Sequence, residues 1–164
     1  MTHQGIYVIE NFFFDDECEY ACELIEKFHA GESSIKTAPE IIEHFKTRII
    51  ARMPTYLTRV DGTKVKVYGL TNDVTLGQGN MNIAFHKDES KHKDNTFKLT
   101  VYVNDLSSDE GTEFKFNEYE SFKVNHKKGN AILFDISILH GGITFPRTEI
   151  KKSIGFRILT EKIN

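Results

Sequence analysis

The sequence has few cysteines, no long apolar run and no excess of charge of one sign. None of its apolar segments approaches the roughly 20 residues that a membrane-spanning helix needs, so we expect no membrane partner. The formal net charge is −3 and the pI is near 6.2, and this acidic balance argues against a nucleic-acid partner.

The two cysteines, Cys18 and Cys22, lie one turn apart in a helical pattern and are too few for a disulfide framework. The N-terminal segment lacks the basic start and the small-residue cleavage site of a signal peptide. We therefore expect reduced thiols and an intracellular, cytoplasmic location.

The composition is that of an ordinary folded protein, with 39% apolar and 27% charged residues in a chain of 164. A chain of this length suffices for one domain with a buried core. We predict a single domain over residues 1–164, in which residues 1–60 form a helical N-terminal support and residues 64–160 form a β core.

Helical spacing predicts two helices in the N-terminal part. The first follows a short apolar strand, residues 6–9, and Asp15 or Asp16 can cap it because a carboxylate accepts the free N–H groups of a first turn. The second begins with Thr37 and Glu40, which form a capping box with a proline in the first turn.

Strand-forming runs and turn residues alternate from about residue 64 onward. The expected strands are KVKVYGL, NDVTL, NIAFH, FKLTVYVND, TEFKFN, ESFKVN, NAILFDIS and KSIGFRIL. Two helices followed by these strands predict a mainly β fold with α (α+β), an antiparallel sandwich or jelly roll with the helices packed on one sheet. The turn-rich residues 69–82 are expected to form a lid.

The stretch AFHKDES, residues 84–90, places His86 and Asp88 two positions apart. Residues i and i+2 of a strand point to the same side, so both side chains can face one metal ion if the strand runs through Asp88. Two imidazoles and one carboxylate on one face of a metal are typical of non-haem Fe(II) oxygenases. A second histidine must then come from a distant strand.

Three downstream histidines are candidates for that ligand. His92 lies in the charged loop KDESKHKDN and His126 in the turn NHKKGN, so both are expected at the surface. His140 follows the nearly continuous apolar strand AILFDISIL and precedes Gly141. A buried imidazole without a partner is costly, so His140 is either a satisfied core histidine or a metal ligand.

The motifs, taken in order, resemble the Fe(II)- and 2-oxoglutarate-dependent dioxygenases of the prolyl hydroxylase-like branch. YVIENFFFDDECEYACELI resembles the entry strand and helix of this branch, FHKDES its metal-binding strand, and EGTEFKF its hairpin. VNHKKGNAILFDISILHGG resembles the approach to the distal histidine, and KKSIGFRIL the closing strand with a basic residue. The likeness covers most of the chain.

The resemblance implies a double-stranded β-helix with His86, Asp88 and His140 as iron ligands. It implies Fe(II), the cosubstrate 2-oxoglutarate and dioxygen as the cofactors, with ascorbate as a further candidate. The tyrosine that this branch often carries upstream of its first ligand is replaced here by Thr75 and Leu76.

The far carboxylate of 2-oxoglutarate needs a cation, because a buried unpaired charge is costly. The candidates that follow His140 are Arg147, Lys151, Lys152 and Arg157. Strand parity places Lys151, Ser153 and Arg157 on the polar, small-residue face of the closing strand. The position of the basic residue in the family favours Lys151 with Ser153. Tyr102 stands where the family often places a tyrosine for the same carboxylate.

The implied activity is hydroxylation of an unactivated C–H bond, coupled to conversion of 2-oxoglutarate to succinate. A prolyl or other peptidyl side chain is the expected substrate, and a free amino acid or small molecule is the alternative. A non-catalytic jelly roll that binds a metal or ligand is a second class. A cupin enzyme is disfavoured because the sequence has no His-x-His, and a nucleic-acid dealkylase because paired arginines are absent from KKSIGFR.

Overall fold

The computed structural model describes residues 3–31, 38–79, 83–106, 111–142 and 149–164. The elements are β1 (Ile6–Ile9), α1 (Asp15–His29), α2 (Ala38–Arg52), β2 (Tyr56–Thr58), β3 (Lys64–Gly79), β4 (Ile83–His86), β5 (Asn95–Tyr102), β6 (Thr112–Lys115), β7 (Ser121–Val124), β8 (Ala131–Asp135), β9 (Leu139–Gly142) and β10 (Lys151–Lys162). No helix in the described ranges is long and apolar enough to cross a membrane.

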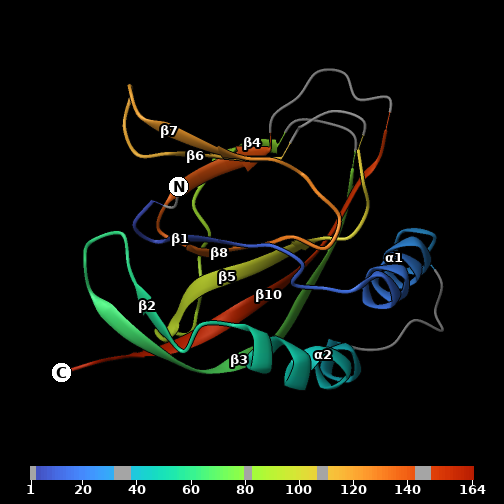
Figure 1. Cartoon of the computed structure of the whole chain (residues 1–164), viewed down its shortest axis with the longest axis horizontal. Coiled ribbons are helices and arrows are strands. Elements are labelled where there is room, and N and C mark those ends of the chain that lie inside the picture. Colours follow the sequence, from blue (N-terminus) through green and yellow to red (C-terminus); the bar gives the residue numbers. More distant parts are fainter. Residues whose placement is uncertain (1–2, 32–37, 80–82, 107–110, 143–148) are drawn as a thin grey trace.

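The strands form two antiparallel sheets. The large sheet has the order β1-β8-β5-β10-β3-β2, and the small sheet has the order β4-β9-β6-β7. Figure 1 shows the small sheet facing one side of the large sheet, with α1 and α2 against the other side. The predicted jelly roll with two helices packed on one sheet is confirmed.

The two faces of the large sheet have different side chains because residues alternate along each strand. On β10, Ile154, Phe156 and Ile158 are fully buried in the cluster that includes Phe45 and other residues of the helices. The alternate residues of the same strand face the small sheet and include glycine and polar side chains. The apolar set therefore fixes the helices, and the other set lines the interior between the sheets.

Two local predictions differ from the structure, and a third lies outside the described residues. KVKVYGL and NDVTL are parts of one 16-residue strand, β3, so residues 69–79 are strand and not a lid, because they pair along β10. The first turn of α1 is not capped by an aspartate: the Glu17 carboxylate accepts the Phe14 N–H at 2.8 Å. The predicted capping box at Thr37 lies outside the described residues.

The apolar run AILFDISIL is not one strand. It is broken after Asp135, where the chain leaves the large sheet and re-enters the structure as β9 of the small sheet. The buried Asp135 carboxylate accepts hydrogen bonds from Arg59 at 2.9 and 3.0 Å, from the Val60 N–H at 3.0 Å and from the Ser137 N–H at 3.0 Å. This satisfied charge stabilises the bend that carries His140 across to the other sheet.

Candidate metal centre

His86 and His140 are direct cross-strand partners in the small sheet. β4 and β9 are antiparallel, and the register places His86 opposite His140, with their ring centroids 4.5 Å apart. Directly opposed residues point to the same face of a sheet, so both imidazoles lie on one face, where His140 is buried and His86 remains exposed. The pairing is irregular between Ile83 and His86, and such irregularities re-aim side chains next to functional sites.

Each histidine is oriented by its own backbone. Nδ1 of His86 lies 2.8 Å from the Ala84 carbonyl oxygen, and Nδ1 of His140 lies 2.9 Å from the Ile138 carbonyl oxygen. A proton on Nδ1 that is donated to the carbonyl leaves the lone pair on Nε2. Both Nε2 atoms are therefore prepared as ligands of one ion.

His140 is additionally held by aromatic rings. The centroid of the Phe134 ring is 4.7 Å from that of His140, and the centroid of the Phe114 ring is 5.9 Å away. Burial lowers the pKa of His140, and the neighbouring His86 and Lys98 lower it further, against the Ile138 carbonyl and Asp88. The lowered pKa favours the neutral imidazole, which is the form that binds a metal.

Asp88 does not lie on a strand, because β4 ends at His86, so the condition that the strand runs through Asp88 is not met. A hydrogen bond from its backbone N–H to the Ile136 carbonyl, at 3.2 Å, holds the segment beside the turn after β8. This hydrogen bond, and not the alternation of side chains along a strand, places the Asp88 carboxylate next to the two histidines. Asp88 Oδ1 is 3.4 Å from His86 Nε2, and Oδ2 is 3.6 Å from His140 Nε2.

The three side chains fit one divalent ion. Their ligand atoms all lie within 4.8 Å of one another. Neighbouring ligands of an octahedral ion with bonds of about 2.1 Å lie about 3 Å apart, and the two distances from the Asp88 carboxylate to the imidazoles are 3.4 and 3.6 Å. Asp88 Oδ2 is buried and makes no hydrogen bond, which is the expected state of an oxygen that is reserved for a cation. The donor set is that of non-haem Fe(II) sites.

Lys151 and Tyr102 lie close together inside the barrel, at the N-terminal end of β10. Lys151 Nζ lies 5.2 Å from the centroid of the Tyr102 ring and donates to the Gly111 carbonyl at 3.3 Å. The Tyr102 hydroxyl is 2.6 Å from the Thr112 hydroxyl. Ser153 is paired with Tyr102 in the sheet. On its other side Ser153 is paired with Gly77, where an added Cβ would lie only 2.9 Å from the Ser153 Oγ, so the glycine leaves room for this hydroxyl.

Arg147 lies outside the described residues, and the other two cationic candidates have different surroundings. Lys152 points to the helices and forms a 2.6 Å ion pair with Glu26 of α1. Arg157 is on the interior face, where its Nη1 donates to the Glu89 carbonyl at 3.1 Å. Of the three, Lys151 alone lies beside Tyr102 and Ser153.

The remaining histidine predictions have different outcomes. His92 is exposed, as expected. His126 is buried, contrary to the expectation of a surface turn, because its Nε2 lies 2.7 Å from the Asn104 carbonyl and its ring packs 4.3 Å from the Tyr102 centroid. Neither belongs to the metal-ligand group.

Sequence reasoning missed Lys98. Its Nζ lies 4.0 Å from Asp88 Oδ2, and burial lowers its pKa, with Asp88 opposing the shift and Arg157 adding to it. The strand parity of β5, read relative to Tyr102, places Lys98 on the interior face and was the available signal.

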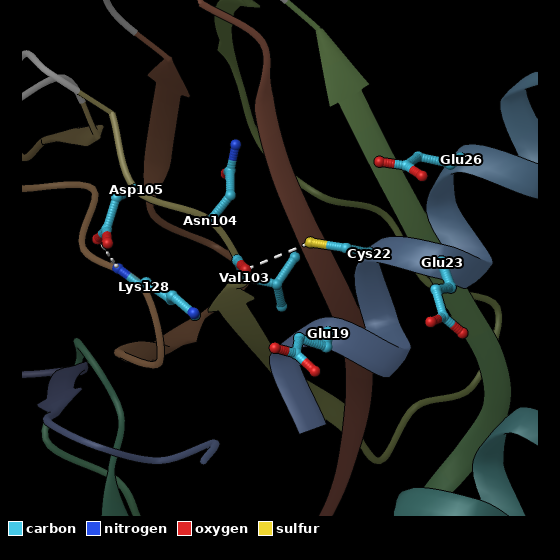
Figure 2. Close-up of a pocket in the computed structure, with 8 residues that line it drawn as sticks. All are labelled: Glu19, Cys22, Glu23, Glu26, Val103, Asn104, Asp105 and Lys128. Carbon is cyan, nitrogen blue, oxygen red and sulfur yellow. Dashed lines mark hydrogen bonds between the residues drawn. The ribbon is translucent and has the colours of Figure 1, made fainter. Parts of the chain in front are cut away.

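A separate pocket of about 400 Å³ lies outside the barrel, between α1 and the end of β5 (Figure 2). Its lining residues are Glu19, Cys22, Glu23, Glu26, Val103, Asn104, Asp105 and Lys128. The Cys22 thiol donates to the Val103 carbonyl at 3.3 Å, and both described cysteines are free, as expected. None of the metal-ligand candidates borders this pocket.

Comparison with known proteins bears on the fold. No protein-family model matches the chain, and no curated protein is detectably similar in sequence. Solved structures do match. A Pseudomonas putida prolyl-4-hydroxylase has a TM-score of 0.59 at 10% identity, over 95% of this chain and 88% of that chain.

Two further solved structures match the same share of this chain. A Trichoplax adhaerens prolyl hydroxylase in complex with a hypoxia inducible factor peptide has a TM-score of 0.60 at 12% identity, over 95% of this chain and 84% of that one. HygX from Streptomyces hygroscopicus, with nickel and 2-oxoglutarate bound, has a TM-score of 0.64 at 11% identity, over 95% and 83%.

This chain shares its fold with these three solved structures. The resemblance that the motifs carry is thereby confirmed at the level of the fold. Within this fold, the His-Asp-His group lies between the two sheets, and the polar face of β10 lies opposite it.

Proposed function

We propose that this protein is a non-haem Fe(II)- and 2-oxoglutarate-dependent dioxygenase that hydroxylates an unactivated C–H bond. The observation that carries the proposal is the convergence of His86 Nε2, Asp88 and His140 Nε2 in a fold shared with such oxygenases. When bound, iron and 2-oxoglutarate supply the oxidising chemistry, and the protein supplies binding, orientation and shielding. One domain over residues 1–164 contains the whole site.

The residues of this chain have separate tasks in the proposed enzyme. His86, Asp88 and His140 hold the metal on one face and leave its other positions for cosubstrate and dioxygen. Lys151 binds the far carboxylate of 2-oxoglutarate, with hydroxyl groups of Tyr102 and Ser153 beside it. The contacts of Lys151 with the Tyr102 ring and the Gly111 carbonyl support this assignment, as does the ion pair that holds Lys152 at the helices.

The preferred substrate is a prolyl or other peptidyl side chain. The solved prolyl hydroxylases support this choice, and one of them is in complex with a peptide. A free amino acid or small molecule is the alternative substrate. No nucleic-acid partner is expected, because the net charge is −3.

An anaerobic titration with Fe(II) and 2-oxoglutarate tests the proposal. The wild-type protein is expected to show a weak visible charge-transfer band, and succinate is expected to form once air and substrate are admitted. His140→Ala is expected to lose the band, whereas His92→Ala, which changes an exposed histidine outside the group, is expected to keep it.

Two results would count against the proposal. Absence of both the band and succinate in the wild-type protein would reject the enzyme. A band without any 2-oxoglutarate consumption, over a panel of proline-containing peptides and free amino acids, would instead favour a non-catalytic metal-binding jelly roll.

A further inference from the structure

Two cations face each other on the interior of the large sheet. Arg157 of β10 pairs directly with Lys98 of β5, and directly opposed residues share one face of a sheet. Like charges in this arrangement destabilise a sheet. The arrangement therefore calls for an anion between or beside the two side chains.

The described residues offer Lys98 one carboxylate, and that carboxylate belongs to a metal ligand. The side chain of Lys98 is only 19% exposed, and Asp88 Oδ2, at 4.0 Å, is beyond hydrogen-bonding distance. The Lys98 stem runs along β10, because a Cβ added at Gly155 would lie 3.1 Å from Lys98 Cε. When Asp88 binds a metal, Lys98 becomes a shielded ammonium next to a dication, which is costly without a further anion.

Arg157 is fixed in a way that leaves donors free for a ligand. Its Nη1 donates to the Glu89 carbonyl at 3.1 Å, in the segment directly after Asp88. If the Asn95 amide is turned so that its oxygen faces Arg157, that oxygen also accepts from Nη1, at 3.2 Å. A guanidinium has five N–H donors in a planar fork that suits an oxyanion, so Nε and Nη2 keep donors for one.

The far carboxylate of 2-oxoglutarate, which is assigned to Lys151, does not account for this pair. Lys151 and Tyr102 lie at the Ser153 end of β10, and Arg157 lies four residues further along the strand. Lys151 and Arg157 are six residues apart on β10, so at about 3.3 Å per residue the two cationic positions are about 20 Å apart along the strand, too far for one carboxylate to contact both.

We propose that Lys98 and Arg157 bind an anionic oxygen group of the substrate, a carboxylate or a phosphate, beside the metal centre. This inference rests on the proposed function, since it takes Asp88 as a metal ligand. It narrows the substrate class: an acidic small molecule, an amino acid with a free carboxylate, or a peptide with an acidic group near the reacting carbon. The pair positions the substrate so that its C–H bond faces the open side of the metal.

A binding experiment tests this without turnover. The protein is loaded with Mn(II) and saturating 2-oxoglutarate, and the paramagnetic relaxation of probe protons is measured. The probes are N-acetyl amino acids, N-acetyl-O-phosphoserinamide as the phosphate arm, and N-acetyl amino-acid amides as neutral counterparts. We expect at least one anionic probe to bind near Mn(II) and its neutral counterpart to bind at least tenfold more weakly.

Variants then assign the contact. Lys98→Met keeps an unbranched apolar stem, and Arg157→Gln keeps a polar end; each is expected to weaken the anionic probe at least tenfold. Lys98→Arg is expected to restore binding, and Lys93→Met, an exposed loop lysine, is the matched control. Mn(II) and 2-oxoglutarate affinities and a thermal melt of each variant separate loss of the anion contact from loss of the metal or the fold.

The outcomes are distinct. Equal binding of charged and neutral probes, no anionic probe binding to a protein that binds Mn(II) and 2-oxoglutarate, or unchanged affinity in both Lys98→Met and Arg157→Gln would overturn this inference alone. Failure of the wild-type protein to bind Mn(II) or 2-oxoglutarate would overturn the proposed function and this inference with it.

Discussion

The two faces of β10 show how one strand separates support from chemistry. Lys151 and Lys152 are sequence neighbours, yet Lys151 lies against the Tyr102 ring inside the barrel and Lys152 pairs with Glu26 on α1. Phe156 and Arg157 repeat the contrast, because the phenylalanine is fully buried under the helices and the arginine faces the interior. The helix-facing set stabilises the sheet, so the interior set is free to carry polar groups.

The largest expected effect belongs to the helix-facing set. Phe156→Ala leaves a cavity against Phe45 and should lower the free energy of unfolding by about 3–5 kcal/mol. Denaturant unfolding monitored by circular dichroism measures the change. A loss below about 1 kcal/mol would mean that the helices do not depend on this face.

The bend between the two sheets is the next most sensitive point. Arg59→Met leaves the Asp135 carboxylate buried without its cation and should cost about 3 kcal/mol. Burial tends to raise the pKa of Asp135, but Arg59 and the Ser137 and Val60 amides hold it below its ordinary value. The free energy of unfolding of the wild-type protein and of Arg59→Met, measured at a series of pH values, checks this prediction.

The sign of the pH effect follows from the lowered pKa. Unfolded Asp135 binds a proton more readily than folded Asp135, so its stabilising contribution is present above the ordinary aspartate pKa. That contribution is lost as the pH falls through the lowered value of the folded state. The difference between wild type and Arg59→Met should therefore shrink in acid; a difference that grows in acid would contradict the prediction.

The comparison of the two lysines predicts a smaller, functional effect. Lys151→Ala removes a charged hydrogen bond worth about 1.5–3 kcal/mol and should raise the KM for 2-oxoglutarate about 10- to 100-fold. Lys152→Ala should leave this KM within about twofold, because the Lys152 side chain pairs with Glu26 on the helix side of the sheet. The loss of this partly exposed ion pair should cost at most about 1 kcal/mol of stability. Metal affinity should be unchanged in both. If Lys152→Ala raised the KM and Lys151→Ala did not, the assignment of the faces would be wrong.

The smallest expected effect is that of one hydroxyl group. Tyr102→Phe keeps the ring and removes the hydroxyl that lies 2.6 Å from Thr112, which should raise the KM for 2-oxoglutarate about fivefold, for about 1 kcal/mol. Tyr68→Phe, on the exposed side of β3 in the same sheet, serves as the control. Equal KM values for the two variants would remove Tyr102 from the cosubstrate pocket.

Local patterns predicted the jelly roll and the parity of β10, because alternation and turn residues are properties of short segments. The course of the backbone and the side-chain positions that depend on residues far away in the sequence were not predictable. AILFDISIL looks continuous, and the break at Asp135 requires Arg59, which lies far away in the sequence. The same holds for Asp88, which is positioned by the Ile136 carbonyl, and for the burial of His126 against Asn104.

Lys98 illustrates the remaining gap. Its place on the interior face follows from parity, but its proximity to Asp88 and its pairing with Arg157 depend on the register of β5 and β10 and on a loop outside both strands. Nothing in the residues around Lys98 encodes that neighbourhood.

The opposition of His86 and His140 across β4 and β9 makes ligation and sheet closure one equilibrium. A slip of one residue between these strands would turn one imidazole to the outside and separate the donor atoms. An ion that binds both rings would therefore stabilise the pairing of β4 with β9. The stability of this pairing would then increase with the free concentration of the ion.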